Sequence, residues 1–145
     1  MDGDPVALRA AIVAHNTDVL GDTVTSGREA GPNIALEVSN GWLFADLSLN
    51  TRGETSFLAA GIEHTFGDGL FLRPALGLAI HDGTLDGARD DLKLGSRVLI
   101  YARADIGIRF DDLTMALRIE HLSNGHTAAH NNGLDNWGIV VGRAF

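Results

Sequence analysis

The sequence predicts an all-β fold, namely an eight-stranded antiparallel up-and-down transmembrane β-barrel. Eight segments alternate between apolar and polar residues with a period of two, which is typical of strands with one apolar face. The chain of 145 residues contains 18 glycines and only three prolines, and glycine is unfavourable inside helices but common in turns. Ten of the eleven basic residues are arginines, whereas water-exposed surfaces usually carry many lysines. The chain therefore has little of the surface expected of a soluble domain.

The expected strands follow one another along the whole chain, and no segment indicates a helix. Their approximate ranges are 6–15, 34–38, 43–49, 58–66, 70–80, 98–109, 115–123 and 135–145. Tight turns are expected at 39–41, 67–69 and 111–112, and longer connections at 16–31, 82–96 and 124–133, with a shorter link at 50–55. In an up-and-down meander, odd and even connections lie at opposite ends. Short turns at one end and long loops at the other are the pattern of outer-membrane barrels.

The two faces of these strands favour a membrane barrel over a soluble lipocalin-like barrel, in which the faces would be exchanged. One face is almost entirely Leu, Ile, Val and Ala, which suits lipid. The other carries balanced charges among small residues, which suits a narrow interior of paired ions. Its charged residues are Arg9, Arg73, Arg103, Arg109 and Arg118, with Glu37, Asp46, Glu63, Asp105 and Glu120. Trp137 and Phe145 are expected in aromatic girdles, and Arg143 is expected to snorkel at the interface.

Composition excludes several other classes of protein. The net charge of −8 argues against nucleic-acid binding, and the absence of cysteine excludes disulfides and thiolate chemistry. No run of eighteen apolar residues is present that could form a transmembrane helix. We expect residues 1–145 to form a single domain. Residues 1–5 lack a basic and an apolar leader region, so an exported protein would be represented here in its mature form with an added Met1.

The residues that carry candidate chemistry lie between positions 115 and 137. His121 and Ser123 continue the apolar face of one strand, about 6.6 Å apart along the backbone. Asp135 lies on the apolar side of the next strand. If His121 pairs with Asp135 in this hairpin, serine, histidine and carboxylate share one face, as in a serine hydrolase. The alternative interpretation is that His121 and Ser123 are polar residues of the barrel rim and that Asp135 caps Gly133 locally after the turn.

The spacing of the other histidines and acidic residues indicates no metal site, and no motif in the sequence indicates a cofactor. His126 and His130 are expected to be solvated, because no carboxylate or third histidine shares their spacing. His64 is expected to lie at the membrane interface near the short-turn end. Basic side chains in the loops could meet lipid phosphates, although solvated loop charge is the simpler interpretation. These basic residues are Arg28, Arg52, Arg89, Lys93 and Arg97.

The segment 118–124, Arg-Ile-Glu-His-Leu-Ser-Asn, with Asn131, Gly133 and then a carboxylate, resembles the outer-membrane lipid A 3-O-deacylases of the PagL type (acyloxyacyl hydrolase-like family). Segments 79–83, 94–97 and 107–111 also resemble parts of that family. The resemblance implies Ser123 as nucleophile, His121 as general base and Asn124 in the oxyanion hole.

This sequence departs from the family pattern at two positions of the motif. Asp135 stands where the best-known members have a glutamate. Gly125 follows the asparagine directly, where those enzymes have glycine one residue later. The backbone N–H of Gly125 or of His126 is therefore expected as the second oxyanion donor.

The resemblance implies a serine esterase of the bacterial outer membrane that removes the 3-O-linked hydroxyacyl chain from lipopolysaccharide in the outer leaflet, without a metal or cofactor. Lipid A and outer-membrane lipids are then the expected partners, nucleic acid is not, and a homodimer is left open. Two alternatives remain at this stage. One is a non-catalytic small outer-membrane barrel with a structural or adhesion role, and the other is a soluble lipid-binding barrel.

Overall fold

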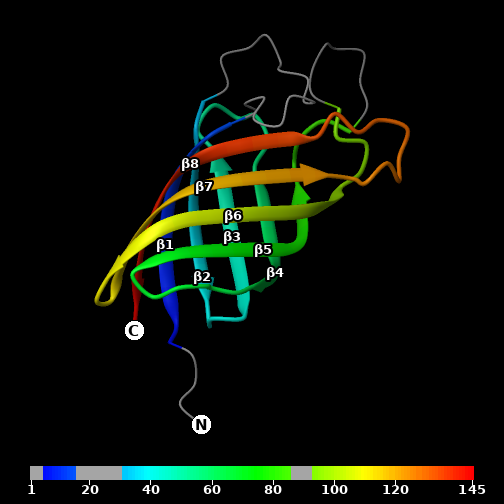
Figure 1. The fold of residues 1–145 in the computed structure, drawn as a ribbon. Coiled ribbons are helices and arrows are strands. Elements are labelled where there is room, and N and C mark those ends of the chain that lie inside the picture. Colours follow the sequence, from blue (N-terminus) through cyan, green and yellow to red (C-terminus); the bar gives the residue numbers. More distant parts are fainter. Residues whose placement is uncertain (1–4, 16–30, 86–92) are drawn as a thin grey trace.

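The computed structural model describes residues 5–15, 31–85 and 93–145. These residues form eight strands, β1 (Ala7–Ala14), β2 (Asn33–Ser39), β3 (Leu43–Asn50), β4 (Phe57–Glu63), β5 (Leu70–His81), β6 (Val98–Phe110), β7 (Leu113–Ser123) and β8 (Leu134–Ala144). Each strand pairs antiparallel with the next, and β1 pairs with β8, so the sheet closes into a barrel (Figure 1). The predicted eight-stranded up-and-down barrel is confirmed. Within the described residues, no helix is long and apolar enough to span a membrane.

The β7–β8 loop lies at one end of the barrel, and the β6–β7 turn and the C-terminus lie at the other (Figure 1). The strand ranges agree closely with the prediction except in β4, which we expected to reach Phe66. The strand ends at Glu63, and Phe66 forms only an isolated bridge with Leu72. Gly67 follows with a φ of 91°, and a Cβ there would lie 2.3 Å from the Leu70 carbonyl oxygen. The chain therefore folds back sharply after Phe66, which ends the continuous pairing early.

The outer face of the barrel is an apolar belt with aromatic residues at its ends. Most outward positions along the strands hold exposed aliphatic side chains, as at Ile34, Leu36 and Val38 on β2. Aromatic side chains are exposed at the short-turn end at Trp42, Phe66, Phe110 and Phe145, and Trp137 is exposed toward the loop end. Aromatic residues flanking an apolar band are typical of the two interfaces of a membrane barrel. The apolar face is therefore the lipid-facing face, as predicted.

The interior of the barrel is filled by a network of buried ions. Its members are Arg9, Arg73, Arg103 and Arg118, with Glu37, Asp46, Glu63, Asp105 and Glu120. Arg118 lies at the centre of this network, with nitrogen–oxygen distances of 2.8 Å to Glu37, 3.2 Å to Asp46 and 2.8 Å to Asp105. Arg9 and Arg103 each contact both Glu37 and Glu63. Opposite charges therefore join strands that are far apart around the barrel.

The prediction that Arg109 belongs to this interior network is wrong. Arg109 is exposed and lines the open mouth of the barrel at the short-turn end, together with Asp111 and Asp112. It has the interior parity of β6, but it lies one residue from the end of that strand, where the lumen opens to water. The alternation of side chains along β6 predicted the direction of the Arg109 side chain correctly, but it did not predict its position along the barrel axis.

Toward the loop end, the interior changes from ionic to apolar. Tyr101, Leu122 and Leu134 are fully buried there and form one cluster with Leu94, which belongs to the β5–β6 connection. The Tyr101 hydroxyl joins the two regions, since it lies 3.0 Å from the Glu120 carboxylate. This apolar plug holds the β5–β6 connection against the start of β8.

We expect Arg118→Met to lower the free energy of unfolding by about 3–5 kcal/mol, because it removes from the interior a cation that contacts three buried carboxylates. The matched control is Arg143→Met, which removes an exposed pair with Asp112 (Nε to Oδ2, 2.7 Å) and should cost less than about 1 kcal/mol. Urea unfolding of both variants in lipid vesicles, followed by tryptophan fluorescence, measures the difference. Equal losses would contradict the central role of Arg118.

Candidate active site

The β7–β8 hairpin brings a histidine and an aspartate together on the outer face of the barrel. His121 pairs with Asp135, and Ile119 pairs with Trp137, so the predicted register is confirmed. His121 Nδ1 donates a hydrogen bond to Asp135 Oδ1 at 2.6 Å. Because Nδ1 is engaged, Nε2 is the nitrogen that remains to accept a proton from another group. The pair therefore has the orientation that a general base requires.

Burial distinguishes the two partners of this pair. The Asp135 side chain is fully buried, whereas the His121 side chain is 29% exposed. Trp137 and Ile139 follow Asp135 on the same face of β8, and both are about half exposed, at 49% and 52%. The carboxylate is thus shielded although it stands on the lipid-facing side. Shielding from water strengthens its hydrogen bond to the imidazole.

Ser123 is the last residue of β7 and lies two positions beyond His121 on the same face. It pairs with Ile100 of β6 and is partly exposed. Among the described residues, no hydrogen bond joins Ser123 to His121. In serine hydrolases the contact between nucleophile and base is often long without substrate and shortens when substrate binds. Strand geometry places the hydroxyl within side-chain reach of the imidazole.

On the inner face directly behind this pair, a second cross-strand contact fixes the same register. Glu120 pairs with Asn136, and Asn136 Nδ2 donates to Glu120 Oε2 at 3.2 Å. Both side chains are completely buried. The hairpin therefore carries one polar pair on each face at the same level. Sequence reasoning assigned Glu120 to the interior but missed its bond to Asn136, because parity does not identify a hydrogen-bond partner.

Asn124 joins the two connections that border the site. Its Nδ2 donates to the carbonyl oxygens of Leu94, at 2.9 Å, and of His130. Its backbone N–H donates to Asn131 Oδ1 at 2.9 Å. Both protons of the side-chain amide are therefore used to hold the β5–β6 connection against the β7–β8 loop. In this arrangement the amide has no proton left for a ligand.

Gly125 and His126 form the tight turn that follows Asn124. Both have a φ of 62°, and the Thr127 N–H donates to the Asn124 carbonyl oxygen at 3.2 Å. Two successive positive φ values are the signature of a type I′ turn. In the part of the chain that the structure describes, the N–H groups of Gly125 and His126 have no protein acceptor. They are therefore available to an oxygen atom of a ligand.

A sequence profile described as lipid A 3-O-deacylase (PagL) matches residues 24–144. The chain belongs to the PagL family of lipid A 3-O-deacylases. Among solved structures it is similar to the outer membrane enzyme PagL, with a TM-score of 0.72, 19% identity and coverage of 96% of this chain and 99% of that one. It is also similar to the Yersinia pestis outer membrane protein Ail, with a TM-score of 0.57, 12% identity and coverage of 99% and 100%. The comparison with curated proteins finds no match.

Membership of the PagL family agrees with the architecture described above. The closed eight-stranded barrel, its apolar outer belt and its family together identify the chain as a bacterial outer-membrane protein. The soluble lipid-binding barrel considered from the sequence is thereby wrong. In this PagL-family protein, the matched region contains the whole β7–β8 hairpin with its histidine, serine and aspartate.

Arg97, which the sequence offered as a contact for lipid phosphates, and His81 both bond to backbone carbonyl groups at the β5–β6 connection. Arg97 Nη1 donates to the carbonyl oxygens of His81, at 3.2 Å, and Gly83, at 2.9 Å. His81 Nε2 lies 2.6 Å from the Ser96 carbonyl oxygen. Both residues therefore support the β5–β6 connection. Arg28 and Arg89 lie outside the described residues.

Two other histidines lie outside the β7–β8 hairpin. His64 lies at the short-turn end, with ring centroids 4.8 Å from Trp42 and 4.6 Å from Phe66, in agreement with the predicted interfacial position. His15 lies just beyond β1, where burial lowers its pKa to about 4. Among the described residues, no three His, Asp or Glu side chains form a group that could hold a metal ion.

We expect Gly95→Ala to lower activity by roughly 100-fold, because small displacements of a catalytic group have effects of this size. Gly95 has a φ of 72°, and a Cβ there would lie 1.9 Å from the His130 carbonyl oxygen and 2.7 Å from Asn124 Nδ2. The added methyl group must therefore separate the two connections. Deacylation assays on refolded protein measure the effect.

The matched control for this prediction is Gly53→Ala. Gly53 has a similar φ of 76°, but nothing lies within 4 Å of its Cβ position. This variant introduces the same backbone strain without the steric conflict. If both variants lost activity equally, strain alone would explain the effect and the contact at Asn124 would not matter.

Proposed function

We propose that Ser123, His121 and Asp135 form the catalytic triad with which this lipid A deacylase hydrolyses the 3-O-linked hydroxyacyl ester. The observation that carries the proposal is the 2.6 Å bond from His121 Nδ1 to Asp135, on the strand face that also presents Ser123. A buried carboxylate that holds a histidine beside a serine is the arrangement that activates a serine hydroxyl.

The reaction follows from these positions. His121 Nε2 accepts the Ser123 proton while Oγ attacks the ester carbonyl carbon, and Asp135 stabilises the imidazolium that forms. Collapse of the tetrahedral intermediate breaks the bond to the sugar oxygen, which takes the proton from His121. Water, deprotonated by the same imidazole, then attacks the acyl-enzyme. The products are a free 3-hydroxy fatty acid and lipid A that carries a hydroxyl at position 3.

The proposed oxyanion donors are the backbone N–H groups of Gly125 and His126. They have no protein acceptor among the described residues, and the turn that holds them directly follows Ser123 and Asn124. Each well-placed donor in a comparable hydrolase contributes about 3–4 kcal/mol to transition-state stabilisation. The role of Asn124 in the oxyanion site is chiefly to position these donors, because its three hydrogen bonds fix this turn.

The position of the triad suits a substrate anchored in the membrane. Ser123 stands at the loop end of the apolar belt, where acyl esters meet the headgroup layer. Below it on β6, Ala102 and Ala104 pair with His121 and Ile119, and both alanines are partly buried between larger neighbours. We assign this low strip to the acyl chain that is cleaved, because it leads from Ser123 toward the membrane interior.

The first test is mass spectrometry of lipid A after incubation with refolded protein in detergent micelles. We expect the mass to fall by one 3-hydroxyacyl group, and Ser123→Ala to slow this loss by at least roughly four orders of magnitude. If correctly folded protein released no acyl group from several types of lipid A, the alternative of a non-catalytic barrel would be favoured.

The second test concerns the third member of the triad. Asp135→Asn should lower kcat by roughly 10⁴-fold with little change in folding, because an amide favours the wrong histidine tautomer. Asp135→Glu keeps the carboxylate and should lose less activity than the asparagine variant. Steady-state kinetics on a soluble 3-hydroxyacyl ester give both values. An asparagine variant with the activity of the unmodified protein would rule out the orienting role of Asp135.

A further inference from the structure

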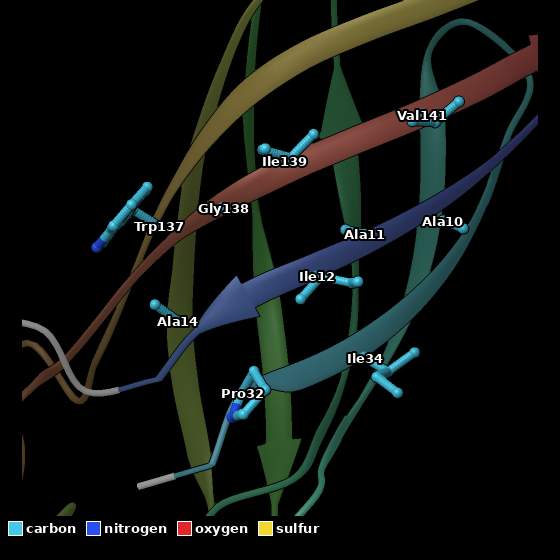
Figure 2. A pocket seen from close by; sticks show the side chains of 10 residues that line it. All are labelled: Ala10, Ala11, Ile12, Ala14, Pro32, Ile34, Trp137, Gly138, Ile139 and Val141. Carbon is cyan, nitrogen blue, oxygen red and sulfur yellow. The ribbon is translucent and has the colours of Figure 1, made fainter. Parts of the chain in front are cut away.

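An apolar groove of about 610 Å³ lies on the outer face of β8, β1 and β2 (Figure 2). It is lined by Ala10, Ala11, Ile12, Ala14, Pro32, Ile34, Trp137, Gly138, Ile139 and Val141. The groove exists because Ala10 and Ala14 present only methyl groups between the larger side chains of Ile12, Ile34 and Ile139. Elsewhere on the belt, long aliphatic side chains occupy most outward positions.

On β1 the groove covers the half of the strand that lies nearest the loop end, from Ala10 to Ala14. On β8 it covers the middle of the strand, from Trp137 to Val141. These four residue steps span about 13 Å along the strand, or about 10 Å along the membrane normal at the strand tilt typical of such barrels, which is less than half of the roughly 30 Å hydrocarbon thickness of a bilayer. The groove is therefore short enough to lie within one leaflet, and its β1 end lies on the side of the long loops, where the outer leaflet holds lipid A.

One wall of the groove borders the candidate active site. Trp137 pairs with Ile119 on one side and with Ala14 on the other, and it lies two residues after Asp135. Ser123 lies on the far side of this wall, beside Ile100. The distance from β7 to β1 is two strand spacings, or about 10 Å. The groove therefore lies beside the candidate site, on the opposite side of Trp137 from the strip at Ala102 and Ala104 that we assign to the cleaved chain.

We propose that the groove binds an acyl chain of lipid A that is not cleaved, while the ester at position 3 lies at Ser123. The proposal rests on the proposed function of Ser123. Lipid A carries several acyl chains on one sugar headgroup, so two chains held on opposite sides of Trp137 fix the rotation of that headgroup. The bilayer is as apolar as the groove, so the groove acts by shape and packing and gives orientation more than affinity.

The test fills the groove and compares two substrates. Ala10→Leu and Ala14→Leu together place larger side chains in it, and both remain compatible with a lipid-facing surface. Gly138 is unsuitable, because a Cβ there would lie 2.1 Å from the Ile12 carbonyl oxygen. Ala45→Leu is the control, since Ala45 is an outward alanine of β3, paired with Ala60 and remote from the groove.

The substrates are hexa-acylated lipid A and the p-nitrophenyl ester of a single 3-hydroxyacyl chain, which reports only the chemistry at Ser123. We expect the double variant to lower the ratio of lipid A turnover to single-chain ester turnover by roughly tenfold. The Ala45 variant should leave that ratio unchanged. An unchanged ratio in the folded double variant would overturn the proposal and assign the groove to bulk lipid.

Two further outcomes would also overturn the groove assignment. If crosslinking showed that the double variant changed the oligomeric state, the groove would be a contact between copies of the chain. If the unmodified protein failed to hydrolyse even the single-chain ester, the proposed role of Ser123 would be overturned, and the groove proposal, which rests on it, would be overturned too. Hydrolysis of that ester with an unchanged ratio would contradict the groove alone.

Discussion

The register between β7 and β8 is the constraint on which the site depends. At one level of this hairpin, His121 bonds Asp135 on the outer face, and Glu120 accepts a hydrogen bond from Asn136 on the inner face. A slip of one residue would exchange the two faces of a strand and place a charged glutamate in lipid. The Glu120–Asn136 pair therefore stabilises the register that the His121–Asp135 pair requires, because a shift of the strands that broke one pair would break both.

The two faces of the barrel meet opposite requirements within the same strands. The interior neutralises its charges through the network around Arg118, while the exterior offers lipid an almost continuous apolar surface. Polar groups on the lipid side are costly near the membrane centre and less so at its edge. His121 and Ser123 stand at that edge, and Asp135 is shielded from its surroundings. Asn124 completes the arrangement by fastening two loops beside the serine.

Alternation along single strands predicted most of the fold and the central pair of the site. Parity placed His121, Ser123 and Asp135 on one face, and the pairing of His121 with Asp135 followed from aligning two neighbouring segments. This alternation could not predict how far along the barrel axis a side chain lies, or which distant segments it contacts. Arg109 has interior parity but lies at the open mouth, and the partners of Asn124 come from two different loops. The groove likewise requires three strands to be aligned before its alanines become neighbours.

The position of the candidate site on the outside of a filled barrel determines how molecules reach it. The lumen is occupied by ion pairs and an apolar plug, so neither reactant nor product crosses the protein. Encounter takes place by lateral diffusion within the plane of one leaflet, and a released fatty acid enters the same plane. Turnover in a membrane should therefore respond to the fluidity of that leaflet and to the cations that crosslink its lipids, even when every side chain of the protein is unchanged.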